Sequence, residues 1–208
     1  MTTNEVLGKY QHLANLSMQY ARDAFRQQSD GQYMYDYEQR NFIVNAAFLK
    51  FFFSWESYLE DIFKCILTGK PSIEGNIIPS LLQAQDEAHA GKIIIGVHKY
   101  FDWANHEYVI QISNILIGTP NPIHSAINSI RSDLQDMRTI RNASAHLTST
   151  VQTPLNSLYQ RLTGILKTDT IPSDILFKNE SSTRKTYWNY YKDLLDIAAE
   201  NIAKGLVI

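Results

Sequence analysis

Cysteine is almost absent from this chain, because Cys65 is the only one among 208 residues. A single thiol cannot form an intrachain disulfide, and this scarcity is typical of proteins from a reducing compartment. Cys65 lies in an apolar stretch, where a small core residue is the simplest interpretation. The chain also opens without the basic and then apolar pattern of a secretory leader, so we expect a cytoplasmic protein.

The sequence lacks any uninterrupted apolar run of about 18 residues, the length that indicates a membrane-spanning helix. Its most apolar stretch, residues 48–53, is soon followed by Glu56 and Glu60, so no membrane partner is expected. An excess of one charge is also lacking, because 19 Lys and Arg residues oppose 21 Asp and Glu residues, for a net charge of −2. This balance argues against a large sequence-independent nucleic-acid footprint but allows a local basic patch.

Glycine and proline number only 9 and 6, and they cluster between segments of helical periodicity. The periodicity predicts long helices over 5–28, 38–67, from about 122 into the 140s, 155–166 and 183–204. Shorter helices are predicted over 77–87, 91–103 and 108–117, and a loop over 168–182. No convincing strand pattern is present. The predicted fold class is therefore all-α: a helical bundle of four to five long helices in a single domain, 1–208, with a helical insertion at about 72–118.

One stretch, residues 137–146, concentrates side chains that can act on a phosphodiester: Arg141, Asn142 and His146. Arginine offers a permanently charged planar fork that suits a phosphate. Histidine can accept or donate a proton near neutral pH, and an asparagine amide can orient either neighbour. Together these groups could cleave a phosphodiester without a metal, by positioning, proton transfer and charge stabilisation.

The position of Arg141 is unusual for a charged residue. Apolar residues precede it in steps of four and three: Ile123, Ile127, Ile130, Leu134 and Met137. The next position in that rhythm is Arg141, so the pattern predicts a guanidinium on the core-facing side, where it must be paired or face a cavity. A purely structural interpretation stays open, in which Arg141 pairs with a carboxylate of the 38–67 helix and His146 caps a helix C-terminus.

Helix geometry limits how the motif can work. Arg138, Asn142 and His146 follow one another at intervals of four and share one face. Arg141 and His146 are five residues apart and point well over a quarter-turn away from each other on an ideal helix. They can converge only if the helix ends or distorts there, or if two copies of the motif meet, as in a symmetric dimer.

An all-α chain with an R-N-x3-H motif late in a long helix resembles the HEPN superfamily. The earlier segment Phe-Ser-Trp-Glu-Ser-Tyr-Leu-Glu at 53–60 is similar to the second helix of that family, in which an aromatic-rich run carries an acidic residue. The resemblance covers about 38–68 and 122–206, and it offers no counterpart for 72–118.

The resemblance implies a metal-independent endoribonuclease without a cofactor, whose sites form where two motifs meet across a homodimer. Such proteins act as toxins or antiviral defence effectors, so an antitoxin or other regulatory partner is expected. Arg141 would bind and polarise the scissile phosphate, and His146 would be the general base or acid for attack by the ribose 2′-hydroxyl. Asn142 and Arg138 would support the motif, and Glu56, or else Glu60, would hold Arg141. The need for a 2′-hydroxyl makes RNA the expected substrate.

Two other functions stay open. Some members of the superfamily are non-catalytic nucleotide-binding or protein-interaction modules, and the low net charge is compatible with that role. Some toxin members also carry a tyrosine two residues after the histidine, and a partner enzyme modifies it. This chain has Thr148 at that position, which argues against this mode of control. A third, weaker hypothesis is a metal-dependent hydrolase, because His98, Asp102 and His106 are spaced like a ligand ladder on a possible helix.

Overall fold

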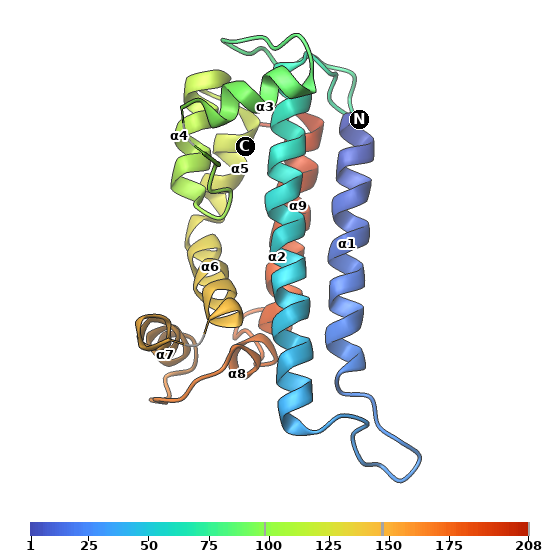
Figure 1. Cartoon of the computed structure of the whole chain (residues 1–208), viewed down its shortest axis with the longest axis vertical. Coiled ribbons are helices and arrows are strands. Elements are labelled where there is room, and N and C mark those ends of the chain that lie inside the picture. Colours follow the sequence, from blue (N-terminus) through green and yellow to red (C-terminus); the bar gives the residue numbers. More distant parts are fainter. Residues whose placement is uncertain (98, 147, 208) are drawn as a thin grey trace. The chain divides into compact units, whose positions relative to one another are not determined.

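The computed structural model describes residues 1–97, 99–146 and 148–207 and is all-α there, which confirms the predicted fold class (Figure 1). Within these residues the long helices are α1 (Thr3–Asp23), α2 (Tyr37–Leu67), α6 (Arg131–Ala145), α7 (Ser149–Thr163) and α9 (Tyr187–Lys204). The shorter helices are α3 (Glu87–Ile95), α4 (His106–Leu116), α5 (Pro122–Ser129) and α8 (Pro172–Leu176). No helix in the described part of the chain is both long and apolar enough to cross a membrane.

The long helix predicted from residue 122 is in fact two helices, because the chain leaves helical geometry at Ile130 (φ −120°, ψ 23°). The Ile130 amide donates to the Ile127 carbonyl at 3.2 Å, which closes a tighter turn than an α-helix allows. The Ser129 hydroxyl also donates to the Ala126 carbonyl at 2.8 Å and competes for the last turn of α5. No proline or glycine marks this break, so the apolar periodicity of the sequence predicts one continuous helix across it.

The predicted helix over 77–87 is wrong, because this segment is irregular up to the start of α3. Asp86 caps α3 instead, where its carboxylate accepts from the His89 amide at 2.7 Å. The helix predicted over 91–103 corresponds to α3, which is shorter. It starts earlier, at Glu87, and ends at Ile95, before Gly96 (φ 57°). The predicted 168–182 loop contains α8, whose Asp174 carboxylate accepts from the Ile171 amide at 2.9 Å.

The chain divides into two compact units. The first contains Met1–Gln11, Trp55–Leu134 and the residues from Leu194 onward. Its core includes three packed rings, with the Tyr10 centroid 6.1 Å from that of Trp55 and 5.4 Å from that of Tyr58. The buried Tyr58 hydroxyl donates to the Ala199 carbonyl at 2.6 Å and so links α2 to α9. Burial raises the pKa of Tyr58 well above its ordinary value, so this hydroxyl stays a donor at any physiological pH.

The second unit contains His12–Ser54 and Gln135–Asp193. Trp188, only 2% exposed, is the centre of its aromatic core. The indole lies edge-on to the Phe48 ring, with centroids 5.4 Å apart, and it also contacts Phe51 at 6.2 Å and Phe177 at 6.1 Å. These rings come from α2, α9 and the turn after α8, so burial of aromatic surface holds three separate segments of the second unit together.

Replacement of Tyr58 by Phe tests the link between α2 and α9. The change removes one buried hydrogen bond at nearly constant volume, so we expect the free energy of unfolding to fall by about 1 kcal/mol. Urea denaturation followed by circular dichroism would measure this loss as a lower midpoint. Tyr100→Phe is the matched control, because Tyr100 is 74% exposed, and it should leave the midpoint unchanged. Equal midpoints for the two variants would contradict a stabilising role for the Tyr58 hydroxyl.

Candidate functional site

The rotation of α6 about its own axis decides where the motif points. The buried residues of this helix include Leu134, Met137, Ile140 and Ala143, in steps of three. The core-facing position after Met137 is therefore occupied by Ile140, and Arg141 lies at the edge of the buried face and is half-buried. The predicted core-facing position of Arg141 is met only in part, because Arg141 is half-buried and Ile140 takes the fully buried position beside it. Around α6, Arg141 is about 40° from Met137 and about 100° from Ile140, so it lies beside the buried face and not at its centre.

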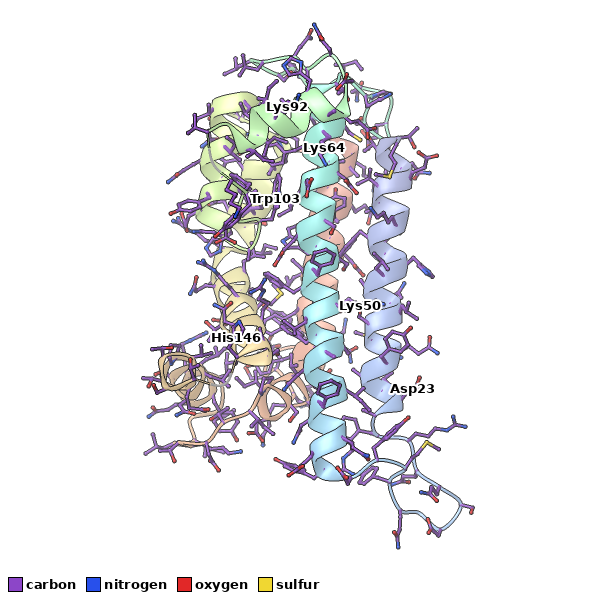
Figure 2. All side chains as sticks on the ribbon, viewed as in Figure 1. Asp23, Lys50, Lys64, Lys92, Trp103 and His146 are labelled. Carbon is purple, nitrogen blue, oxygen red and sulfur yellow. The ribbon has the colours of Figure 1, made fainter. Side chains whose placement is uncertain are left out.

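The other motif side chains lie on the opposite side of α6. Asn142 is about 160° from Ile140 around the helix axis, at about 100° per residue. Arg138 and Asn142 are half-buried and His146 is exposed. Figure 2 shows His146 at the C-terminal end of α6. The predicted shared face of Arg138, Asn142 and His146 is therefore turned away from the core of the second unit.

Hydrogen bonds tie the motif residues to one another. The Arg141 Nη1 group donates to Asn142 Oδ1 at 3.4 Å, so the amide oxygen faces the guanidinium. The His146 backbone amide donates to the Asn142 carbonyl at 3.0 Å, which carries the helical pattern as far as His146. On an ideal helix Arg141 and His146 would be about 140° apart around the axis. The α6 helix ends at Ala145, so His146 is the first residue after it.

The acidic residues expected to hold Arg141 lie on α2. Glu60 Oε1 accepts from Lys64 Nζ at 2.5 Å, within the first unit. Glu56 is half-buried, and its pairing with Arg141 stays a prediction.

The segment that follows the motif is fixed by polar contacts within the second unit. Arg161 of α7 pairs with Asp136 of α6, whose side chain is 12% exposed. The carboxylate raises the pKa of the Arg161 guanidinium above its ordinary value, chiefly through their hydrogen bond. The Gln152 amide donates to the Thr170 carbonyl at 2.8 Å, and the Asn156 amide donates to the Thr168 carbonyl at 2.9 Å. These contacts attach α7 both to α6 and to the loop before α8.

The metal-ligand ladder does not form on one helix. His98 lies outside the described residues, Asp102 precedes α4, and His106 is its first residue. The Asp102 carboxylate accepts from the Ala104 amide at 3.2 Å, and the buried His106 ring lies with Nε2 3.2 Å from the Glu107 carboxylate. Among the residues the structure describes, no three His, Cys, Asp or Glu side chains gather closely enough to hold a metal.

Two features of the second unit have no clear signal in the sequence. The Asp136–Arg161 pair joins residues 25 positions apart, and no local pattern signals such a pairing. The outward face of α2 carries Phe42 and Phe53, which are 74% and 63% exposed. Phe42 and Phe53 are spaced like residues on one face of a helix. The buried Phe residues between them, at 48, 51 and 52, obscure this pattern in the sequence.

Comparison of the chain with protein-family models, with curated proteins and with solved structures finds no match.

The Asp136–Arg161 pair can be tested through Arg161→Gln. This change removes the guanidinium from a largely buried carboxylate, so we expect a loss of about 1 kcal/mol in the free energy of unfolding; the exposure of Arg161 limits the effect. Thermal denaturation would measure the loss as a lower Tm. Arg26→Gln, at an exposed position in the same unit, is the control and should leave the Tm unchanged. A Tm for Arg161→Gln equal to that of the control would show that the pair does not stabilise the unit.

Proposed function

We propose that this protein is a metal-independent endoribonuclease of the HEPN type, with Arg141, Asn142 and His146 as its catalytic motif. The observation that carries the proposal is that no motif side chain is buried: Arg141 and Asn142 are half-buried and His146 is exposed. Asn142 also lies opposite the buried Ile140 around α6. A motif of this composition that ends in an exposed histidine can be reached by a nucleic-acid backbone.

The proposed reaction needs only groups that the chain supplies. His146 takes the proton of the ribose 2′-hydroxyl, and O2′ attacks the adjacent phosphorus. The bond from phosphorus to O5′ breaks as the bond to O2′ forms, and O5′ leaves with a proton from a general acid. The products are a 2′,3′-cyclic phosphate and a 5′-hydroxyl end. The Arg141 guanidinium neutralises charge on the non-bridging oxygens as it develops, and Asn142 orients that guanidinium.

A second copy of the motif completes this chemistry. On an ideal helix Arg141 and His146 of one copy would point about 140° apart, so a phosphate held by one arginine would lie away from the histidine of the same chain. A homodimer with facing motifs supplies a histidine for the 2′-hydroxyl and another for O5′. Arg138, one turn before Asn142, adds a cation for a neighbouring phosphate. In this proposal Glu56 holds Arg141 in place, and the protein acts in the cell as a toxin or antiviral effector restrained by a regulatory partner.

The role of His146 can be tested with RNA cleavage in excess EDTA. We expect wild type to cleave and His146→Ala to lose at least about 100-fold in rate, the usual contribution of a general acid or base. His12→Ala is the matched control, because His12 is also exposed and belongs to the same unit, and it should keep full activity. Equal activity in His146→Ala would refute the proposal. Phosphate-dependent RNA binding without turnover in wild type would favour the non-catalytic nucleotide-binding module instead.

The nucleophile can be tested through the substrate. A single 2′-deoxy nucleotide on the 5′ side of the mapped cleavage site removes the attacking oxygen, so cleavage at that bond should stop. The same substitution one nucleotide further along is the control and should leave cleavage at the mapped site intact. Electrophoresis of end-labelled products would read both results and identify the cyclic phosphate. Cleavage that persists at the substituted position would exclude attack by the 2′-hydroxyl.

A further inference from the structure

The N-terminal half of α2 is apolar on two opposite faces. One face is buried and carries Phe48, Phe51 and Phe52, each at most 1% exposed. The other carries an apolar stripe in steps of four, three and four, which consists of Phe42, Ala46, Leu49 and Phe53. Ala46 is exposed, Leu49 is half-buried, and the two Phe side chains are largely in solvent. A helix with apolar residues on both sides is normally covered on both sides.

The spacing of this stripe is that of a helix-to-helix seam. Steps of four and three repeat every 3.5 residues on average, the period at which apolar side chains of one helix meet those of a partner helix. The stripe extends for about 16 Å, at about 1.5 Å per residue. It lies wholly within the second unit, on residues 42–53. Its geometry therefore fits another helix better than it fits a flat surface or an extended peptide.

The order of residues in the stripe is nearly the same in both directions. Large aromatic residues, Phe42 and Phe53, stand at its ends, and Ala46 and Leu49 stand between them. When two copies of α2 pack antiparallel about a two-fold axis, Phe42 lies opposite the Phe53 of the other copy, and Ala46 lies opposite Leu49. Self-complementarity of this kind is what an isologous contact between identical chains requires. A small residue opposite a large one in the middle also lets the helices approach closely.

The stripe also ends in a hollow that can receive a side chain. Tyr35, Glu38, Gln39, Phe42 and Ile43 line a space of about 430 Å³ at the beginning of α2. The surface of this hollow is almost entirely apolar. The antiparallel arrangement brings the other copy's Phe53 to this end of the helix, so an exposed phenyl ring and an apolar hollow meet twice in each dimer.

The charge next to the stripe also favours the antiparallel arrangement. Lys50 is turned towards α1, where its Nζ lies 5.3 Å from the Tyr20 ring centroid (Figure 2). In the antiparallel register Lys50 lies opposite Asn45, a neutral residue. A parallel pairing would instead bring the two copies of Lys50 to the same level along the seam, which costs energy through like-charge repulsion.

We propose that a second copy of this chain covers the stripe, with the two α2 helices antiparallel and each Phe53 seated in the partner's hollow beside Phe42. The proposal rests on the face of α2 alone and holds whether or not the α6 motif cleaves RNA. It assigns an interface, which the motif by itself does not specify.

Sedimentation velocity across a concentration series would test the interface. Wild type should be dimeric at micromolar concentration. Phe53→Glu places a charge in the apolar hollow, so the dissociation constant of the dimer should rise by at least about 30-fold, as for an interface hot spot. Tyr100→Glu, a change at another largely exposed aromatic residue, should leave the dimer intact. Phe53 is outside the core, so both variants should keep the wild-type circular dichroism spectrum, and a loss of the dimer is then not a loss of the fold. A monomeric wild type, or a dimer unaffected by Phe53→Glu, would overturn the proposal.

Cross-linking tests the antiparallel register. In a Cys65→Ser background, Phe42→Cys combined with Phe53→Cys should give a covalent dimer with a short bis-maleimide. Phe42→Cys alone should not, because the antiparallel register holds the two copies of position 42 about 16 Å apart along the seam. Efficient cross-linking of the single variant would exclude this register, and so would a double variant that sediments as a dimer but does not cross-link. RNA cleavage is not a readout here, so failure of the interface and failure of the nuclease proposal are distinguishable.

Discussion

The burial of Met137, Ile140 and Ala143 fixes the rotation of α6, and the orientation of the whole motif follows from it. Once these three side chains face the core of the second unit, Arg138 and Asn142 lie on the other side of the helix, because successive residues are about 100° apart; there they are half-buried, and His146 beyond them is exposed. Arg141 is left at the boundary between the two faces. The chemistry proposed for this protein therefore depends on apolar packing on the far side of the helix.

Much of the fold was readable from the sequence because long helices leave a strong periodic signal. The predicted ends of α2 agree with the structure within one residue at each end, since the polar-to-apolar change at Glu38 and the Thr-Gly-Lys-Pro stop at 68–71 are local signals. The break at Ile130 was unreadable because it depends on side-chain bonding in the last turn of α5 rather than on a helix-breaking residue. The start of α7 was also misplaced, because Pro154 lies inside the helix, where proline usually indicates a boundary.

The candidate site was predictable in composition and less so in geometry. Asn142 and His146 follow one another at helical spacing, so their shared face could be derived from the sequence alone. The burial of Arg141 could not, because it lies about 40° from the buried Met137 around α6, and its exposure depends on which distant segments cover that edge of the helix. The expected partner of Arg141 depends on contacts between distant segments, for which a single sequence carries no signal. The stripe on α2 was visible in the spacing of Phe42 and Phe53, but only the structure distinguishes it from the buried aromatic face of the same helix.

The polar contacts of α7 are of two kinds, one between charged groups and two between uncharged groups. They therefore respond differently to ionic strength. Dissolved salt screens the attraction between Asp136 and Arg161, since the guanidinium is largely in solvent. The amide hydrogen bonds from Gln152 and Asn156 to the loop at 168–170 join uncharged groups and are almost insensitive to screening. As ionic strength rises, α7 therefore keeps its hold on the loop that leads to α8 while its electrostatic attraction to α6 weakens. The contact that salt weakens is the one between α6 and α7 at Asp136, while the amide bonds to the loop persist.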